Sequence, residues 1–305
     1  MSSCSTGFNQ GAPINGFLGV DKPPGWTSQD VVGWVRNHFS IKKVGHTGTL
    51  DPMATGVVVL ALNAYTRLSS FVTGSTKRYR AVVRLGAKTD TLDADGTITQ
   101  RSAVGVPTLE TVESALDHFK GKISQIPPMY SAIRVAGRRL YELARKGVEV
   151  ERAPRDIEIY ALDVIAYRWP LLHLDVRCSK GTYIRSLADD IGQLLGCGGF
   201  LVTLRRTSVG PVGLDRCLSM KSLRLAEETG SLSESLIAHE VVLHDVPSVS
   251  LSADQLKPFS NGNSVEGLNT DTTGTVRVLN LQAELLGVGH VDGGVLKPQR
   301  VIHNR

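Results

Sequence analysis

The segment GHTGTLDPMATG at 45–56 holds the side chains best suited to do chemistry in this chain. Its carboxylate, Asp51, precedes Pro52, whose ring favours an extended backbone in the residue before it. The flanking glycines allow a ligand or another backbone to approach closely. An ionised carboxylate held in this way can attack an electrophilic carbon or stabilise cationic character beside it. The simpler alternative is that Asp51 caps a turn and that His46 makes only local hydrogen bonds.

Two strands and a helix are expected to hold this segment. The apolar run at 17–21 predicts a short strand, and Thr27 with Asp30 forms a capping-box pattern that predicts a helix to about position 39. The run at 55–62 is apolar and β-branched, which predicts a buried strand directly after the carboxylate. Polar residues in a Gly-rich loop before a buried strand favour a site.

Three further segments show clear periodicity. Positions 78–85 alternate between an apolar face that includes Tyr79 and a partly cationic face, which predicts a strand. Positions 172–178 also alternate, and 184–194 have helical spacing. In contrast, the stretch at 134–155 carries seven basic against three acidic residues with little periodicity, and we interpret it as a basic insertion.

The composition limits the class of protein. The chain has 305 residues, 41% of them hydrophobic, and a mean hydropathy of −0.03, which is enough apolar material for a core and excludes wholesale disorder. No apolar run approaches the roughly 20 residues that a membrane span needs. The net charge of +5 is uneven, with +8 on 1–220 and −3 on 221–305. The first part is therefore suited to meet a polyanion, although an ordinary solvated basic surface is the simpler interpretation.

The opening residues and the cysteines bear on location. Residues 1–15 are polar and lack the basic start and apolar middle of a signal peptide, so we expect a flexible tail. The four cysteines are sparse and show no metal-ligand spacing. Without an export signal, they predict a reducing, cytoplasmic environment.

Beyond position 245 the amino-acid composition changes. It becomes rich in Gly, Asn, Ser and Thr, with short apolar runs such as 276–279 and 285–288. Such runs, separated by turn-forming residues, are typical of small β-rich domains. We therefore expect a second domain over 246–305.

Six motifs follow one another along the chain. They are GFLGVDKPPGWTS (16–28), GHTGTLDPMATG (45–56), KRYR (77–80), RLGAKTDTLDADG (84–96), QIPPMYSA (125–132) and CSKGTYIR (178–185). In this order they resemble the motifs of the TruB family, the bacterial tRNA pseudouridine synthases that modify uridine 55 of the T-loop. LLGVG (285–289) and LKPQR (296–300) resemble the PUA RNA-binding fold, whereas 246–274 carry little resemblance.

The resemblance implies a fold and a reaction. The fold is α+β, with a mixed, mainly antiparallel sheet and flanking helices over 16–245, and a small PUA-like RNA-binding domain over 246–305. The basic stretch, at about 121–155, would be a mobile thumb-like insertion. The reaction is isomerisation of uridine to pseudouridine, in which the bond from ribose C1′ to N1 breaks and C5 bonds to the same carbon. Nothing is oxidised or hydrolysed, so no cofactor and no metal is implied.

Three side chains are implied to be catalytic. Asp51 would be the catalytic carboxylate, and Arg185 the opposite charge that favours its ionised form. Tyr79 would stack on the flipped base. Taken without the resemblance, Arg185 is a surface residue at a helix start and Tyr79 is a core residue of its strand. Whether Asp51 attacks the sugar, attacks the base or promotes elimination stays open.

Five more residues are implied to bind substrate. Tyr183 resembles a second pocket tyrosine, Leu204 a pocket-wall leucine, and His46 a histidine that holds displaced T-loop nucleotides. Asp90 resembles an RNA-contacting acid, and Lys22 a residue that supports the wall of the site. Each also has an ordinary explanation as a core residue or a polar loop residue.

The implied partner is the T-arm of tRNA, bound by a monomer with no obligatory protein partner and no membrane. Phosphate contacts from the thumb-like stretch should make binding weaken with salt, while selection should depend on arm shape and loop bases. The basic residues concerned are Arg134, Arg138, Arg139, Arg145, Lys146, Arg152 and Arg155.

Two alternatives remain. One is the RNA-guided relative of this family, which works inside a protein–RNA particle. The other is a tRNA-binding folding helper with secondary catalysis. The thumb-like insertion and the non-basic C-terminal part favour the stand-alone enzyme.

Overall fold

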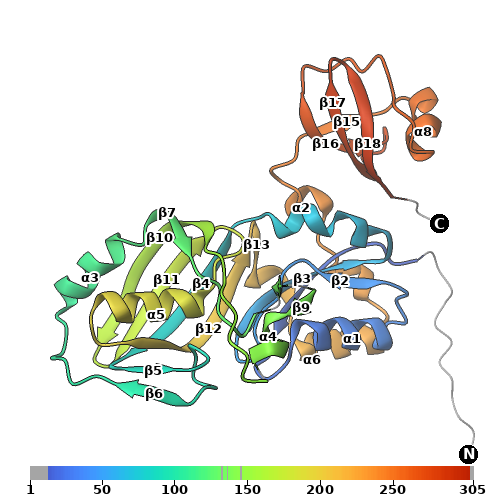
Figure 1. Ribbon diagram of the computed structural model, residues 1–305. Helices are drawn as coiled ribbons and strands as arrows, with labels where there is room; N and C mark the ends of the chain where they lie inside the picture. Colours follow the sequence, from blue (N-terminus) through green and yellow to red (C-terminus); the bar gives the residue numbers. More distant parts are fainter. Residues whose placement is uncertain (1–12, 132, 136, 145, 303–305) are drawn as a thin grey trace, which may run out of the picture. The chain divides into compact units, whose positions relative to one another are not determined.

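The computed structural model describes residues 13–302 apart from positions 132, 136 and 145 (Figure 1). Of the predicted tail at 1–15, only residues 13–15 are described. Cys4, Arg145 and the last three residues of the predicted second domain also lie outside the described residues. The side chains of Arg134 and Arg139 also lie outside the described part.

The chain divides into two compact units. The first unit is built from Met1–Pro52, Gly56–Gly74 and Gly210–Arg305, and the second from Met53–Thr55 and Ser75–Val209. The strands and helices of each unit are described separately below.

In the first unit, strands pair around β1 (Gly16–Lys22). β3 (Thr55–Leu62) runs antiparallel to β1, and β14 (Cys217–Leu218) runs parallel to it, so the sheet is mixed. β2 (Val44–His46) pairs antiparallel with β3. Seven of the eight residues of β3 are buried, which confirms the buried strand predicted at 55–62.

Helix α1 (Ser28–His38) follows β1 and begins with the predicted capping box. Thr27 Oγ1 accepts a hydrogen bond from the Asp30 N–H at 3.0 Å, and Asp30 Oδ2 accepts one from the Thr27 N–H at 2.8 Å. These bonds satisfy two backbone donors that a helix start otherwise leaves unpaired. The buried side of the helix consists of Ser28, Val31, Val32 and Val35.

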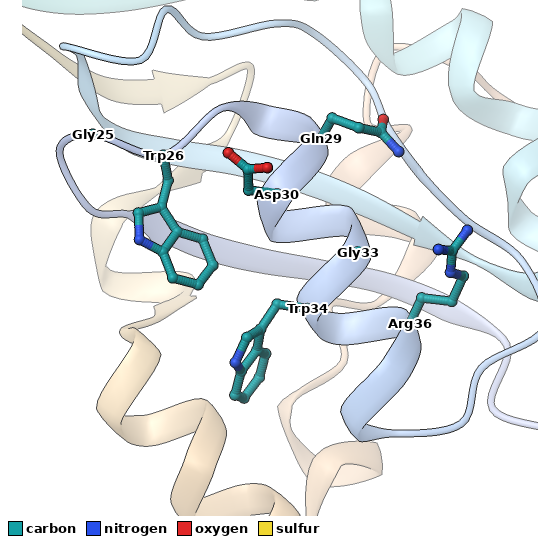
Figure 2. Close-up of a pocket in the computed structure, with 7 residues that line it drawn as sticks. All are labelled: Gly25, Trp26, Gln29, Asp30, Gly33, Trp34 and Arg36. Atoms are coloured by element: carbon teal, nitrogen blue, oxygen red, sulfur yellow. The ribbon is translucent and has the colours of Figure 1, made fainter.

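The outer side of α1 carries a shallow, open groove, which Figure 2 shows. Trp34 lies along it and stacks on His38, with ring centroids 4.0 Å apart. Gly33 lies within the groove, and a Cβ added there would meet nothing within 4 Å. The groove is lined by Gly25, Trp26, Gln29, Asp30, Gly33, Trp34 and Arg36.

The other helices of the first unit are short. They are α2 (Ser69–Thr73), α6 (Met220–Thr229), α7 (His239–Val242) and α8 (Ala253–Ser260).

The second unit is built on five antiparallel strands. In sheet order they are β12 (Gly199–Val209), β4 (Lys77–Leu85), β11 (Leu171–Cys178), β10 (Arg155–Arg168) and β7 (Gly121–Gln125). The alternation predicted for β4 is confirmed, because Tyr79 and Ala81 are buried while Arg78 and Arg80 are exposed. The strand predicted at 172–178 is β11.

Helix α5 (Ile184–Leu194) matches the predicted helix and packs on β12. The contact is close because two glycines face each other there. A Cβ on Gly192 would overlap the backbone nitrogen of Gly199, so only glycine fits at this position. Helix α3 (Leu109–Asp117) packs on β10.

The basic stretch leaves the sheet between β7 and β10. Residues 121–125 of the predicted insertion belong to β7, so the excursion itself spans 126–154. It contains the two-residue strands β8 (Arg134–Val135) and β9 (Arg138–Arg139), which pair with each other, and α4 (Leu140–Ala144). A second hairpin of this unit pairs β5 (Ala87–Thr89) with β6 (Ile98–Arg101).

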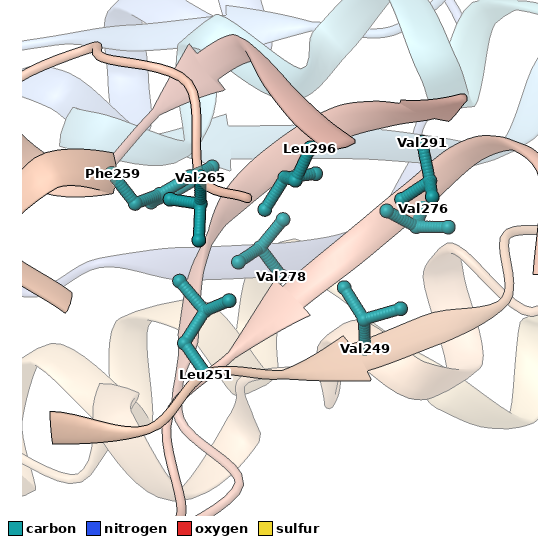
Figure 3. Close-up of a cluster of buried hydrophobic side chains, with 8 residues drawn as sticks. All are labelled: Val249, Leu251, Phe259, Val265, Val276, Val278, Val291 and Leu296. Carbon is teal, nitrogen blue, oxygen red and sulfur yellow. The ribbon is translucent and has the colours of Figure 1, made fainter. Parts of the chain in front are cut away.

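The C-terminal residues form a four-stranded sheet with a core of its own, shown in Figure 3. The predicted apolar runs lie in β16 (Gly274–Leu279) and β17 (Leu285–Asp292), which are antiparallel. β15 (Ser248–Ser250) and β18 (Val295–Val301) flank them. Eight buried side chains fill the core: Val249, Leu251, Phe259, Val265, Val276, Val278, Val291 and Leu296.

The small β-rich C-terminal part expected from the sequence is therefore present. Within the described residues, no helix is both long and apolar enough to cross a membrane.

Candidate active site

The predicted site residues are distributed over both units. Lys22, His46 and Asp51 belong to the first unit. The second unit holds Tyr79, Asp90, Tyr183, Arg185 and Leu204. We describe the two groups in turn.

The loop that carries Asp51 connects β2 to β3 and is fixed at its start. His46 is the last residue of β2, lies opposite Leu60 and is half-buried. Directly after it, the Thr47 N–H donates to the Val59 carbonyl at 3.0 Å, and the Thr47 hydroxyl donates to the same oxygen at 3.2 Å. The loop therefore leaves the sheet at a defined point.

Asp51 itself lies between two residues that are bound to the segment from β1 to α1. On one side, the Ser28 hydroxyl accepts from the Leu50 N–H at 2.8 Å and donates to the Leu50 carbonyl at 3.3 Å. On the other side, the Gly25 N–H donates to the Pro52 carbonyl at 2.9 Å. Asp51 is half-buried, and its backbone is held on both sides by these hydrogen bonds.

The buried side chain of Lys22 also binds the loop that carries Asp51 to the segment after β1. Its side chain is completely buried, and Nζ donates to the carbonyls of Pro23 at 3.0 Å, Trp26 at 2.5 Å and Pro52 at 3.1 Å. Three carbonyls match the three donors of an ammonium group. Lys22 thus closes the turn after β1 and ties it to Pro52, a geometry that fits the support role expected for it.

In the second unit, Tyr79 and Leu204 lie on one face of adjacent strands. Tyr79 of β4 is opposite Arg206 of β12, and Leu204 is opposite Ala81. Cross-strand partners share a face of the sheet, so Tyr79 and Leu204 are diagonal neighbours. Both are buried, with 8% and 6% of their surface exposed. The structure therefore brings together the predicted stacking ring and the predicted wall leucine.

Arg185 is a buried residue, 5% exposed, in the first turn of α5. Its Nη2 donates to the Tyr130 carbonyl at 2.8 Å, and Nη1 donates to the Thr91 carbonyl at 3.4 Å. Nη1 also lies 3.5 Å from Asp93 Oδ2. The interpretation of Arg185 as a surface residue is therefore wrong.

Asp93 is a buried acid beside Arg185 that the sequence analysis did not single out. It is 5% exposed, and its Oδ1 accepts from the Thr91 hydroxyl at 2.5 Å. Burial raises the pKa of the Asp93 carboxyl, while the Thr91 hydroxyl and the Arg185 guanidinium act in the opposite direction. The only signal in the sequence was its place in the motif at 84–96. That motif contains three aspartates, and the sequence alone does not distinguish between them.

Asp90, the aspartate chosen from that motif, has a different setting. It is exposed, and its Oδ1 accepts from the Thr97 N–H at 2.8 Å while its own N–H donates to the Thr97 carbonyl at 3.2 Å. These bonds close the loop between β5 and β6. Asp90 shapes this loop, and the expected RNA contact stays a prediction.

Tyr183 is held at the N-cap position of α5 through its backbone. Gln125, the buried last residue of β7, accepts from the Tyr183 N–H at 2.8 Å and donates to the Tyr183 carbonyl at 3.1 Å. The phenol ring is half-buried. The motifs at 125–132 and 178–185 are therefore joined by one glutamine side chain.

Buried charge at these positions is mainly basic. In the part of the chain that the structure describes, the buried charged side chains are Lys22, Lys77, Arg185 and Arg206 against a single acid, Asp93. Burial, and next the nearby Arg206, lower the pKa of Lys77 to about 8.

The fold is shared with solved structures of known complexes. A Cbf5–Nop10–Gar1 complex matches with a TM-score of 0.74 at 24% identity, covering 94% of this chain and 85% of that one. An H/ACA RNP bound to a substrate RNA containing 2′-deoxyuridine matches with a TM-score of 0.72 at 22% identity, covering 98% and 92%. These likenesses confirm the expected fold class.

The family follows from closer likenesses. The tRNA pseudouridine synthase B of Dechloromonas aromatica is 43% identical over 290 residues, which cover 95% of this chain and 96% of the relative. That of Dehalococcoides mccartyi is 45% identical over 249 residues, 82% and 83% of the two chains. The model of the TruB family pseudouridylate synthase N-terminal domain matches 36–184, and C-terminal TruB models match 185–244 and 247–302. The chain belongs to the TruB family.

Proposed function

We propose that this protein isomerises uridine to pseudouridine in tRNA, at position 55 of the T-loop, with Asp51 as its catalytic carboxylate. The observation that carries the proposal is the loop geometry: Leu50 and Pro52, on either side of the half-buried Asp51, are both hydrogen-bonded to the β1–α1 segment. A preorganised charged group of this kind stabilises a transition state without reorganisation. Relatives 39–45% identical over most of the chain are tRNA pseudouridine synthases.

The reaction balances within the substrate. The bond from C1′ to N1 breaks, the base turns, a bond from C1′ to C5 forms, and the hydrogen on C5 leaves as a proton while N1 gains one. Three routes are open to Asp51: attack on C1′, attack on the base, or removal of a sugar proton in an elimination. Each of them needs an ionised carboxylate at position 51.

Arg185 and Tyr79 are proposed to complete the catalytic set. Arg185 is a fully oriented cation, since its guanidinium contacts two backbone carbonyls and Asp93. We assign to it the stabilisation of negative charge in the site. Tyr79 supplies a flat surface for the extruded base, for which stacking is worth about 1–3 kcal/mol. Leu204 beside it forms the apolar wall, and Asp93 orients Arg185.

RNA binding is proposed to involve the remaining residues and the basic stretch. His46, Tyr183 and Asp90 would contact T-loop nucleotides. Lys22 would support the loop of Asp51 through its hydrogen bond to the Pro52 carbonyl. Extruding a base costs a few kcal/mol, which phosphate contacts from the basic residues of 126–154 would offset. We propose that the protein acts in the cytoplasm on the T-arm, as a monomer and without an obligatory protein partner. The RNA-guided alternative is less favoured, because the Cbf5 and H/ACA RNP complexes are only 22–24% identical to this chain, whereas the tRNA pseudouridine synthases are 39–45% identical.

Replacement of the carboxylate tests the proposal. Unmodified tRNA incubated with the wild-type protein is expected to gain pseudouridine at position 55, mapped by position along the RNA. Asp51→Asn keeps the shape of the side chain but removes its charge, so pseudouridine formation should fall by at least about 10³-fold while the RNA dissociation constant changes less than about threefold. Asp254→Asn, an exposed aspartate at the start of α8, is the matched control and should behave as wild type.

Two results would count against this assignment. A wild-type protein that binds tRNA and forms no pseudouridine would support the folding-helper alternative. Pseudouridine at another position would contradict the T-loop as target.

A further inference from the structure

Ser28 has an unusual place for a residue at a helix start. It is the first residue of α1 and is only 2% exposed. Its hydroxyl does not cap the helix, because Thr27 already accepts the hydrogen bond from the Asp30 N–H. Both hydrogen bonds of the Ser28 hydroxyl go instead to Leu50, 22 residues away.

These two bonds act on the peptide units that flank Leu50. The Leu50 N–H and carbonyl are both bound by one hydroxyl, at 2.8 and 3.3 Å, and the Leu50 side chain is 3% exposed. The Leu50 carbonyl belongs to the peptide group that also contains the Asp51 nitrogen. Fixing that carbonyl therefore fixes the plane from which Asp51 emerges.

The other side of Asp51 is fixed by separate contacts. Pro52 restricts the backbone of the residue before it, and the Pro52 carbonyl accepts from Gly25 N–H and Lys22 Nζ. Ser28 thus supplies two hydrogen bonds that hold the Leu50 side. Because a misplacement of about 1 Å can cost about 10²-fold in rate, this contact bears directly on the carboxylate.

We propose that Ser28 is a positioning residue for the reaction: its hydroxyl holds the Leu50–Asp51 peptide so that the carboxylate of Asp51 meets the target nucleoside. This inference rests on the proposed function. Ser28 does not touch the substrate in this account, so its removal lowers the rate of the chemical step and leaves RNA affinity unchanged. If Ser28 had a purely structural role, its removal would instead lower the stability of the protein, and the rate and the RNA affinity would fall together.

The test compares three variants with wild type in the full-length chain, using an unmodified tRNA transcript. Ser28→Ala removes both hydrogen bonds, and the single-turnover rate at saturating protein is expected to fall at least about tenfold, with the RNA dissociation constant within about twofold of wild type. Ser28→Thr keeps the hydroxyl and should restore most of the rate. Ser219→Ala removes a hydroxyl that accepts from the Ser222 N–H at the start of α6, and should leave the rate unchanged.

The outcomes separate the possibilities. A wild-type rate in Ser28→Ala, or a loss that Thr does not restore, would overturn the inference while leaving the proposed function intact. An equal loss of rate in Ser219→Ala would assign the effect to stability and would also overturn it. If Ser28→Ala does not fold, Ser28→Cys fills the same space with a weak donor and is expected to show the same loss. A wild-type protein without activity would overturn both the inference and the function.

Discussion

At the scale of single residues, the charges that the fold buries are the most informative feature. Arg185 is surrounded by two backbone carbonyls and Asp93, so its guanidinium has one orientation. Lys77 is buried on the same face of β4 as Tyr79, two residues away. Burying a charged ammonium group costs free energy because the group loses its hydration, and this lowers the pKa of Lys77.

This change in pKa predicts how stability depends on pH. The unfolded lysine titrates near 10.5 and the folded one at about 8. Between these values the unfolded state binds more protons, so the free energy of unfolding rises with pH. From about pH 7.5 to about pH 10, Lys77 should contribute an increase on the order of 2 kcal/mol, measured by urea unfolding.

Matched variants isolate the contribution of Lys77. Lys77→Met should remove this increase and be more stable than wild type at neutral pH. Lys122→Met, at an exposed position of β7, should retain the increase. The same pH dependence in wild type and Lys77→Met would contradict the assignment to Lys77.

At the scale of elements, two glycines within helices have opposite roles. Gly33 lies in α1 at the open groove, where an added Cβ meets nothing within 4 Å. Gly192 lies in α5 against Gly199, where an added Cβ would overlap a backbone nitrogen. The same substitution should therefore change stability in opposite directions.

Gly33→Ala should raise the free energy of unfolding by about 0.5–1 kcal/mol, because alanine loses less backbone entropy in a helix. Gly192→Ala should lower it by about 1–3 kcal/mol or more, because α5 must move away from β12. Denaturant unfolding of the two variants side by side measures both. If Gly33→Ala lowered the free energy of unfolding, the prediction would be contradicted, because the added methyl group would then have to meet other atoms in the groove.

At the scale of the whole molecule, charge should govern the encounter with RNA. The net charge of +8 on 1–220 and the basic residues of 126–154 predict phosphate contacts. The logarithm of the tRNA association constant should therefore fall linearly with the logarithm of salt concentration. A constant affinity between low and moderate salt would contradict this account.

The basic stretch can be tested separately. Arg138→Gln with Lys146→Gln removes two exposed charges, and the salt slope should become shallower by about 0.7–0.9 for each phosphate that these side chains no longer neutralise. Lys221→Gln with Arg224→Gln removes the same charge from α6 and should leave the slope unchanged. Equal effects of the two pairs would show that only net charge matters.

Much of the fold was predictable from the sequence because the signals are local. The capping box of α1, the buried run of β3 and the alternation of β4 and β11 follow from residues close together in the chain. Within the basic insertion predicted at about 121–155, residues 121–125 form β7, since pairing with β10 outweighs a weak local pattern.

The family and the candidate carboxylate could be predicted from local patterns alone: an aspartate before a proline in a glycine-rich loop, a strand with alternating faces, and six ordered motifs that resemble those of one family. The contacts that hold the candidate site residues could be seen only once the chain was folded. Ser28 reaches Leu50, Gln125 binds the Tyr183 backbone, and Asp93 rather than Asp90 lies beside Arg185. These contacts join residues distant in the chain, and each depends on burial, which makes a hydrogen bond obligatory and which no local pattern encodes.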